Sequence, residues 1–224
     1  MNKNQELIKN VEKIKKGYAT RFLDSKMQLE LKNRLKKDEY QIYYPYKDSE
    51  KVIFYSNTSP KVSLLEIVTR EKLEHREILG TVFSLGLDDS MFGDIVISSD
   101  KYYLYVLDEI KDYVINNLII INKIRVTLEE RDLNILKDFE RKYLELEIIS
   151  SSERIDTVIS HLIGINRTKI KDLMKEKDII LNYEVACNIS KRLEVGDIFS
   201  IRRFGKYRYL GVMKRTKSDN LIIR

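Results

Sequence analysis

Apolar residues between positions 155 and 177 follow the spacing of two short helices. In the first they recur at i, i+3, i+4, i+7 and i+8, which places on one face Ile155, Val158, Ile159, Leu162 and Ile163. Gly164 predicts the end of this helix, and Asn166 predicts the N-cap of the next. The second helix is expected from about Arg167 to Lys177, with an inward face of Ile170, Leu173 and Met174.

After this helix the apolar period changes from 3.6 to 2, which predicts short strands. They are expected at Ile179–Leu181, Glu184–Cys187, Ile198–Arg203, Tyr207–Met213 and Leu221–Ile223. Turn residues separate the strands at Asn182-Tyr183, Val195-Gly196-Asp197, Phe204-Gly205-Lys206 and Ser218-Asp219-Asn220. The last third of the chain is therefore predicted to be two helices on a small, strongly bent sheet.

The first 70 residues predict a helical hairpin followed by short strands. The first helix carries an apolar face of Leu7, Ile8, Val11, Ile14 and Tyr18. The second, from Phe22 to Leu35, turns Leu31 and Leu35 inward. Strands are expected at Gln41–Tyr46, Val52–Tyr55 and Val62–Val68. The tyrosines of this region are expected to fill half-buried strand positions, with stacking on RNA bases as the alternative: Tyr43, Tyr44, Tyr46 and Tyr55.

A helix–strand–strand–helix–strand order follows, which is typical of an open α/β plait, the RRM-like shape of many RNA-binding modules. The helix Glu71–Leu85 has an inward face of Leu73, Ile78, Leu79, Val82 and Phe83. Gly93-Asp94 is expected as a turn. The later elements are a hairpin of Ile95–Ile97 and Tyr102–Leu107, a helix from Asp108 to about Asn117, and strands at Leu118–Ile121 and Ile124–Leu128. The region lacks the aromatic RNA-contact motifs of an RRM.

These elements predict an α+β fold in three parts. Residues 1–70 form the helical hairpin with its strands, residues 71–149 the plait, and residues 150–224 the two helices on a bent sheet. The charge-rich stretch Asp138–Glu147 is expected as a helix or strand that leads into a linker, Ser150-Ser151-Ser152.

Positive charge is concentrated in the last part. Residues 151–224 contain 16 Lys and Arg against 9 Asp and Glu, a net charge of +7, whereas the first 150 residues contain 25 against 26, a net charge of −1. Such a concentration indicates a polyanionic partner, with a solvated basic surface as the alternative. Membrane lipids are a weaker alternative, because the basic residues are spread over strands and turns as well as a helix.

Four short motifs in the last third resemble the S4 RNA-binding domain in their order and spacing: Arg154-Ile155-Asp156, Asn166-Arg167, Ile179-Ile180-Leu181-Asn182 and Val195-Gly196-Asp197-Ile198. Further motifs resemble the YlmH family of bacterial S4 proteins: His75-Arg76, Leu79-Gly80, Leu85-Gly86-Leu87, Phe92-Gly93-Asp94-Ile95, and the tail motifs Ser200-Ile201-Arg202 and Phe204-Gly205-Lys206. The resemblance covers most of the chain from about residue 60 onward. Two positions depart from the S4 pattern, which has Gly where Lys177 and Tyr183 stand. A non-glycine residue in a left-handed conformation costs about 1 kcal/mol.

Cations of the second helix predict a phosphate-binding surface. Arg167, Lys171 and Lys175 fall at successive steps of about 40° along one flank. We expect contacts to structured RNA, mostly to phosphates and shape, from Arg154, Arg167, Lys169, Lys171 and Lys175, and contacts to a neighbouring RNA segment from Arg202, Arg203, Lys206 and Arg208. The alternative for Arg167 is a surface ion pair with Glu153 or Asp172.

The residues of an enzyme site are not apparent in the sequence. His75, His161 and Cys187 lack metal-ligand spacing, and no glycine-rich phosphate loop or dinucleotide fingerprint occurs, so no metal and no cofactor are expected. The adjacent carboxylates Asp88-Asp89 and Glu129-Glu130 point apart. No apolar run reaches 18 residues, the N-terminus lacks a signal-peptide core and Cys187 is the single cysteine, so we expect a cytoplasmic protein without a membrane span. We also expect a monomer.

The resemblance to YlmH implies a non-enzymatic protein that binds structured rRNA, and tRNA as a further candidate, on the large ribosomal subunit. It also implies a role in translation quality control or in the rescue of ribosomes with an obstructed nascent chain. A link of the family to cell division supplies the main alternative, a protein-interaction adaptor whose basic part contacts an acidic protein. An RNA-modification accessory factor is the other alternative.

Overall fold

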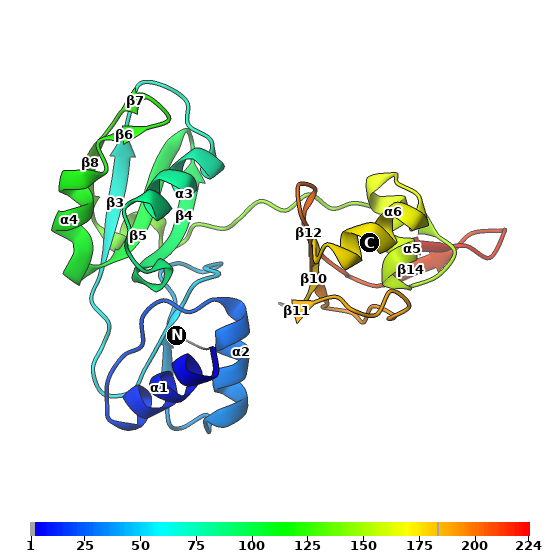
Figure 1. Ribbon diagram of the computed structural model, residues 1–224, viewed down its shortest axis with the longest axis horizontal. Coiled ribbons are helices and arrows are strands. Elements are labelled where there is room, and N and C mark those ends of the chain that lie inside the picture. The colour runs from blue at the N-terminus through cyan, green and yellow to red at the C-terminus, as the bar shows by residue number, and fades with distance from the viewer. Residues whose placement is uncertain (1–2, 183) are drawn as a thin grey trace. The chain divides into compact units, whose positions relative to one another are not determined.

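The computed structural model describes residues 3–182 and 184–224, so Tyr183, one of the two departures from the S4 pattern, lies outside the described residues. The chain forms two compact units, Met1–Arg141 (unit 1) and Lys142–Arg224 (unit 2) (Figure 1). Unit 1 contains all of the expected first part and most of the expected second part. The α+β class is confirmed in both units.

Unit 1 begins with two helices, α1 (Lys3–Lys15) and α2 (Ser25–Arg34), and a two-stranded sheet of β1 (Gln41–Tyr43) and β2 (Ile53–Tyr55). Their shared core contains Leu7, Ile14, Leu23, Met27, Leu31, Leu35, Val52 and Phe54. Asp24 caps α2 by accepting a 2.7 Å hydrogen bond from the Met27 amide. The inward placement expected for Ile8 and Tyr18 is wrong, because both side chains are exposed. A buried stripe through positions 7 and 14 leaves position 8 about 100° around the helix.

The second part of unit 1 confirms the α/β plait. In chain order it contains β3 (Val62–Val68), α3 (His75–Ser84), β4 (Phe92–Ser98), β5 (Lys101–Leu107), α4 (Lys111–Asn117) and β8 (Thr127–Arg131). The antiparallel sheet has the order β4-β5-β3-β8, which is the arrangement of a split βαβ plait. A small hairpin, β6 (Ile120–Ile121) and β7 (Ile124–Arg125), precedes β8. Short 3-10 turns lie at Asp89–Met91, Asp108–Ile110 and Leu133–Leu136.

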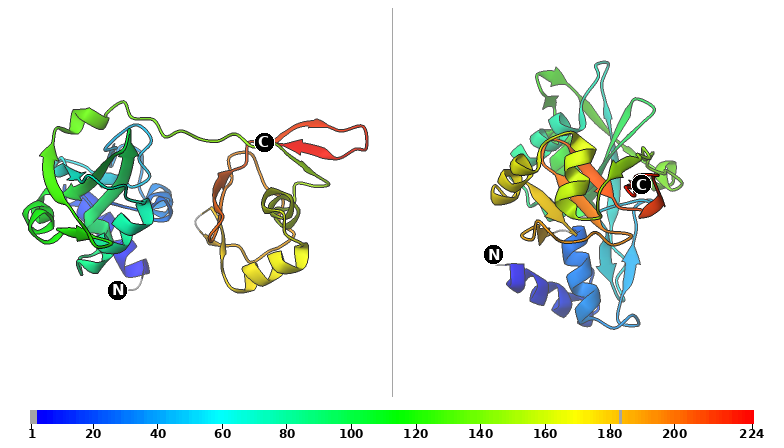
Figure 2. Two further views of the ribbon diagram at one scale, coloured as in Figure 1. Left: turned by 90° about the horizontal axis from the view of Figure 1, so that it is seen from above. Right: turned by 90° about the vertical axis from the view of Figure 1, so that its right-hand side faces the viewer.

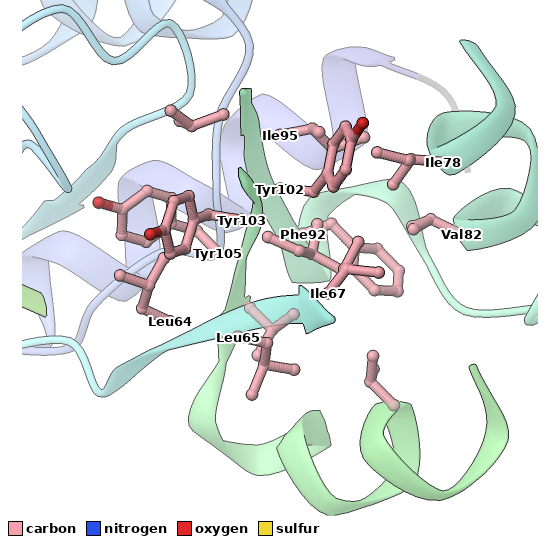
Figure 3. Packing of buried hydrophobic residues seen from close by; sticks show 14 of the residues in the cluster. Leu64, Leu65, Ile67, Ile78, Val82, Phe92, Ile95, Tyr102, Tyr103 and Tyr105 are labelled. Carbon is pink, nitrogen blue, oxygen red and sulfur yellow. The ribbon is translucent and has the colours of Figure 1, made fainter. Parts of the chain in front are cut away.

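Side chains of the plait sheet pack on both of its faces. In Figure 3, Ile78 and Val82 of α3 point toward Tyr102 on one face, while Tyr103 and Tyr105 lie on the other side of β5. The inward placement expected for Phe83 is wrong. Its side chain is exposed because it lies about 100° around α3 from the buried Val82.

The plait face that carries Tyr105 is covered by an earlier part of the chain. The ring of Tyr46 stacks on that of Tyr105 with 5.8 Å between centroids. A Cβ added to Gly93 would lie 2.8 Å from Cβ of Tyr105 and 2.9 Å from the ring of Phe22. Glycine at 93 therefore permits the close approach of this covering segment. Gly93-Asp94 lies within β4 at an irregularity in the register, so its expected placement in a turn is wrong.

Residues 139–147 form neither helix nor strand, contrary to the expected helix or strand in Asp138–Glu147. The expected serine linker is also wrong at its start, because Ser150 ends β9 (Ile148–Ser150) and is completely buried. Strand β9 pairs with β15 (Leu221–Ile223), with Ser150 opposite Leu221. The Ser150 hydroxyl donates to the carbonyl of Ser152 at 2.7 Å. The irregular segment therefore precedes the serine run.

Unit 2 contains the two expected helices, α5 (Ile155–Ile163) and α6 (Arg167–Lys175), and two small sheets. One sheet has the order β11-β10-β12-β13, made from β10 (Ile179–Leu181), β11 (Glu184–Val185), β12 (Ile198–Ile201) and β13 (Gly205–Arg208). The other has the order β14-β15-β9 and includes β14 (Val212–Arg215). The expected strand Tyr207–Met213 is thus two strands. The chain bends between them at Gly211, whose φ of +109° suits glycine.

Candidate nucleic-acid interface

The turn between α5 and α6 follows the local signals in the sequence. Gly164 ends α5 in the left-handed conformation, with φ of 69°. The side chain of Asn166 caps α6 by accepting a 2.9 Å hydrogen bond from the Lys169 amide. Ile170 is buried in the core of unit 2, and Leu173 and Met174 pack against that core. This packing fixes the direction in which the cations of α6 leave the helix.

A buried carboxylate joins Arg154 and Arg167. Asp156, in the first turn of α5, has 2% of its surface exposed. It accepts hydrogen bonds from Nε and Nη2 of Arg154 at 3.1 and 3.0 Å, and from Nε and Nη2 of Arg167 at 3.1 and 2.5 Å. The two arginine side chains remain 37% and 53% exposed. The ion-pair partner of Arg167 is therefore Asp156, and the alternatives Glu153 and Asp172 are wrong.

The charge state of Asp156 is set by opposing effects. Burial raises the pKa of its carboxyl, but the hydrogen bonds from Arg154 and Arg167 and the positive charges of both residues outweigh burial, so the pKa lies below its ordinary value. Asp156 is therefore an anion at neutral pH, and the group of three side chains keeps a net charge of +1.

Three further cations of α6 are exposed. Lys169 and Lys171 have no ion-pair partner among the residues that the structure describes. Lys175 lies 3.6 Å from Asp172, in a pair whose two side chains are both largely exposed. Such exposed pairs contribute little to stability. The lysines are thus open to an anionic ligand.

The hairpin of β12 and β13 adds the second predicted group of cations. Arg202 and Arg203 lie in its turn, and Arg202 lies 3.2 Å from Asp178, the third residue after α6. This pair places the hairpin turn beside the end of α6. Lys206 and Arg208 alternate along β13 with Tyr207, whose ring stacks on Phe199 at 5.5 Å. The two cations therefore share the face of the strand opposite to Tyr207.

The predicted residues thus form two neighbouring groups. Arg154 and Arg167 meet at Asp156, while Arg202 lies next to the end of α6. Asp156 is a residue of this site that the sequence did not predict. The available signal was a carboxylate in the Arg-Ile-Asp motif, two positions after one arginine and eleven before the other. No local spacing rule connects positions 156 and 167.

Unit 1 uses its conspicuous polar residues internally. Asp94 is buried and accepts hydrogen bonds from the Tyr46 hydroxyl at 2.8 Å, the Glu50 amide at 2.7 Å and Nη2 of Arg141 at 3.3 Å. The expected half-buried strand positions are confirmed for Tyr43 in β1 and Tyr55 in β2, whereas Tyr46 is buried outside any strand. Tyr44 is exposed and lines a pocket of about 340 Å³ with Pro45, Tyr46, Lys47 and Lys137.

Residues 3–182 and 184–224, which the structure describes, contain no group of three or more His, Cys, Asp or Glu side chains that could hold a metal ion. None of their helices is long and apolar enough to cross a membrane. Burial lowers the pKa of His75 most, with a further lowering by the charge of Arg141.

The fold and its basic surface define a class: an α+β protein with a plait in one unit and cations around two helices and a hairpin in the other. Comparisons with known proteins make this class more specific. A family described as "Putative RNA-binding domain in YlmH" matches residues 58–135, which contain the plait. The chain is 32% identical over 150 residues to "Ribosome-associated protein quality control protein P2" of Bacillus subtilis (strain 168). That match covers 66% of this chain and 57% of the relative, so the chain spans little more than half of the relative's length.

A solved structure, "Cell division protein ylmH from Streptococcus pneumoniae", is 29% identical with a TM-score of 0.48 and covers 61% of this chain and 91% of its own. The family match and the Bacillus relative confirm the resemblance to the YlmH family that the sequence indicates.

Proposed function

We propose that the protein binds structured RNA of the large ribosomal subunit through the basic surface of unit 2. We further propose that it acts, without catalysing a reaction, in translation quality control in the cytoplasm. The observation that carries the proposal is the group of Arg154 and Arg167 held on the buried carboxylate of Asp156. Support also comes from the family description, which names RNA binding, and from the Bacillus relative, whose name includes ribosome association and quality control.

The arginine pair has the chemistry of a phosphate site. A guanidinium has five N–H donors. Asp156 engages Nε and Nη2 of each arginine, so at least three donors on each remain for a ligand. Because Asp156 fixes both guanidiniums before RNA arrives, binding loses less side-chain entropy. Lys169 and Lys171 extend the positive surface along α6, where phosphate contacts would position the protein without reading sequence.

The test is co-sedimentation of the purified protein with ribosomal subunits across a salt series. Neutralising several phosphates gives a linear fall of log affinity with log salt. We expect salt-sensitive binding to the large subunit. In the double variant Arg167→Ala, Lys171→Ala, the slope of log affinity against log salt concentration is expected to be smaller in magnitude by about 2. The matched control is Lys36→Ala, Lys37→Ala, which removes two exposed cations from unit 1 and is expected to bind like the wild type.

Binding that survives both ribonuclease treatment and the Arg167→Ala, Lys171→Ala variant would contradict the proposal. That outcome would favour the adaptor alternative, in which the protein contacts another protein. Peptidyl-tRNA, the further RNA candidate, is tested by comparing vacant subunits with subunits that carry an obstructed nascent chain. Tighter binding to the second sample is expected if tRNA is contacted.

A further inference from the structure

In the hairpin of β14 and β15, the first strand is open to solvent. All four residues of β14 are exposed. The strand lies at the edge of its sheet, because β15 separates it from β9. Figures 1 and 2 show this hairpin projecting from unit 2 on the side away from β10 and β12. β14 is therefore an exposed edge strand, whereas Leu221 and Ile223 of β15 are buried in the core of unit 2.

The turn of this hairpin is firmly hydrogen-bonded. The Thr216 amide donates to the Asn220 carbonyl at 2.7 Å, and the Asp219 amide donates to the Thr216 carbonyl at 3.0 Å. The Thr216 hydroxyl also accepts from the Asn220 amide at 3.0 Å. These three bonds hold the backbone of the turn in a fixed arrangement.

The hairpin carries an excess of positive charge. Its cations are Lys214, Arg215 and Lys217, and its one carboxylate is Asp219, which lies 2.7 Å from Arg215. Lys214 and Lys217 are exposed and have no ion-pair partner in the part of the chain that the structure describes. Lysine on an edge strand commonly prevents pairing with another sheet. That explanation applies to Lys214 but not to Lys217, which lies in the turn beyond the end of β14.

The position of the hairpin separates it from the predicted RNA surface. The turn at Arg202 and Arg203 lies at the start of β13, whereas Lys217 lies beyond the end of β14. The chain runs from the first turn through β13, Gly211 and β14 to the second. Each strand of four residues extends about 13 Å. The two turns also lie on opposite sides of unit 2 in Figure 1. One phosphate group therefore cannot be shared between them.

We propose that the β14–β15 hairpin is a second phosphate-binding element, which contacts an RNA segment distinct from the segment at α6. The inference rests on the proposed function and extends it to Lys214 and Lys217. An exposed edge strand and turn that carry lysines suit the backbone of an RNA helix, where phosphates and 2′-hydroxyls, rather than base edges, are accessible. Two separated contacts would fix the orientation of unit 2 as well as its position.

The test compares Lys214→Gln, Lys217→Gln with Lys169→Gln, Lys171→Gln, using purified large ribosomal subunits and chemical footprinting of their RNA. Both variants leave the Asp156 group and the Arg215–Asp219 pair intact. Each is expected to reduce the salt slope of binding by about 2. The hairpin variant is expected to lose protection in one RNA segment and the α6 variant in another. Lys214→Arg, Lys217→Arg is expected to restore the wild-type footprint, because it restores the charge.

The possible results separate the two proposals. If the wild type does not protect RNA at all, the proposed function fails and the hairpin inference fails with it. If the α6 variant loses protection but the hairpin variant keeps the wild-type slope and footprint, only the hairpin inference is overturned. A hairpin variant that weakens every protected segment equally would also overturn it, because the hairpin would then act only through its general charge.

Discussion

The two units both place helices on antiparallel sheets, but they use charged residues in opposite ways. In unit 1, Glu66 lies 2.6 Å from Nε of Arg131 and 3.3 Å from Nζ of Lys101, and Asp94 engages Arg141. In unit 2, one buried carboxylate serves two exposed arginines, and the lysines of α6 around them are exposed. The charges compared in unit 1 therefore join parts of the fold, whereas the cations on α6 of unit 2 remain exposed.

The plait sheet of unit 1 also uses its aromatic residues inside the fold. A plait that stacks bases needs open aromatic residues on its central strands. In unit 1 the aromatic residues of β5 are buried, and Tyr46 stacks directly on Tyr105. The plait thus has the shape of an RNA-binding module but has this part of its sheet filled from within. A familiar shape does not define a function unless the residues at the relevant surface are open.

Among the substitutions that test this difference between the units, Asp94→Ala is expected to have the largest effect. The substitution removes the acceptor for Tyr46, the Glu50 amide and Arg141, and leaves a partly buried guanidinium without one of its partners. Breaking a buried charge network costs about 3 kcal/mol. We expect the free energy of unfolding of unit 1 to fall by about that amount in urea titrations, with RNA binding by unit 2 retained.

Asp138→Ala is the matched control for this experiment, because it removes an exposed carboxylate from the same unit and is expected to leave the unfolding curve unchanged. Equal loss of stability in both variants would contradict the internal role assigned to Asp94. Loss of RNA binding in Asp94→Ala at temperatures where unit 1 stays folded would mean that the charged residues of unit 1 also contribute to RNA binding.

A smaller effect is expected from Asp156→Asn, which retains the shape of the side chain but removes its charge. Arg154 and Arg167 would lose the anion that orients them, at about 0.5 to 1.5 kcal/mol of ordering per side chain. We expect RNA affinity to fall by about tenfold, although the variant is more positive overall. Asp172→Asn removes the same charge from an exposed pair and is expected to leave affinity equal or higher. Tighter binding by both variants would refute the positioning role of Asp156.

The pH dependence of Asp156 gives an independent measurement. Its pKa is lowered in the folded protein from the ordinary value of 3.8, so it stabilises unit 2 above that pH and this contribution is lost as pH falls through the folded pKa. The difference in unfolding free energy between the wild type and Asp156→Asn is therefore expected to be largest near neutral pH and to shrink below about pH 4. A difference that is constant down to pH 2 would contradict the lowered pKa.

The smallest expected effect concerns the backbone conformation of Lys177 in unit 2. Lys177 has φ of 61°, a left-handed conformation that glycine adopts more easily. We expect Lys177→Gly to raise the free energy of unfolding by up to about 1 kcal/mol. Lys175→Gly removes the same charge from the last residue of α6 and is expected to lower it by about 0.5 to 1 kcal/mol. Thermal melts that shift in the same direction for both would show that the backbone at 177 is not strained.

Much of the fold could be predicted because its signals are local. The glycine at 164 and the asparagine at 166 each determine the conformation of their own turn, so the limits of α5 and the start of α6 followed from the sequence. The order of elements in the plait likewise followed from apolar periods of 3.6 and 2.

The wrong predictions concern features that depend on contacts between distant parts of the chain. An apolar residue such as Ile8 or Phe83 has the right period, but which of two adjacent positions is buried depends on the partner surface. The bend at Gly211 and the burial of Ser150 depend on the pairing of β15 with β14 and β9. For the site, helical spacing identified the cations of α6, whereas Asp156 and Arg167 meet only because the chain reverses between α5 and α6.

The irregular segment of residues 139–147, which contains the boundary of the two units, has a practical consequence for handling the protein. Arg141 is held by Tyr46 and Glu50 at one side, while Glu145 and Glu147 lie 3.4 and 3.1 Å from Arg224 at the other. Between these anchors Tyr143 and Leu144 are 70% and 82% exposed. Chymotrypsin-like proteases prefer large apolar side chains in accessible, irregular backbone of this kind. Brief digestion is thus a natural way to obtain each unit as a separate fragment, each with its own hydrophobic core.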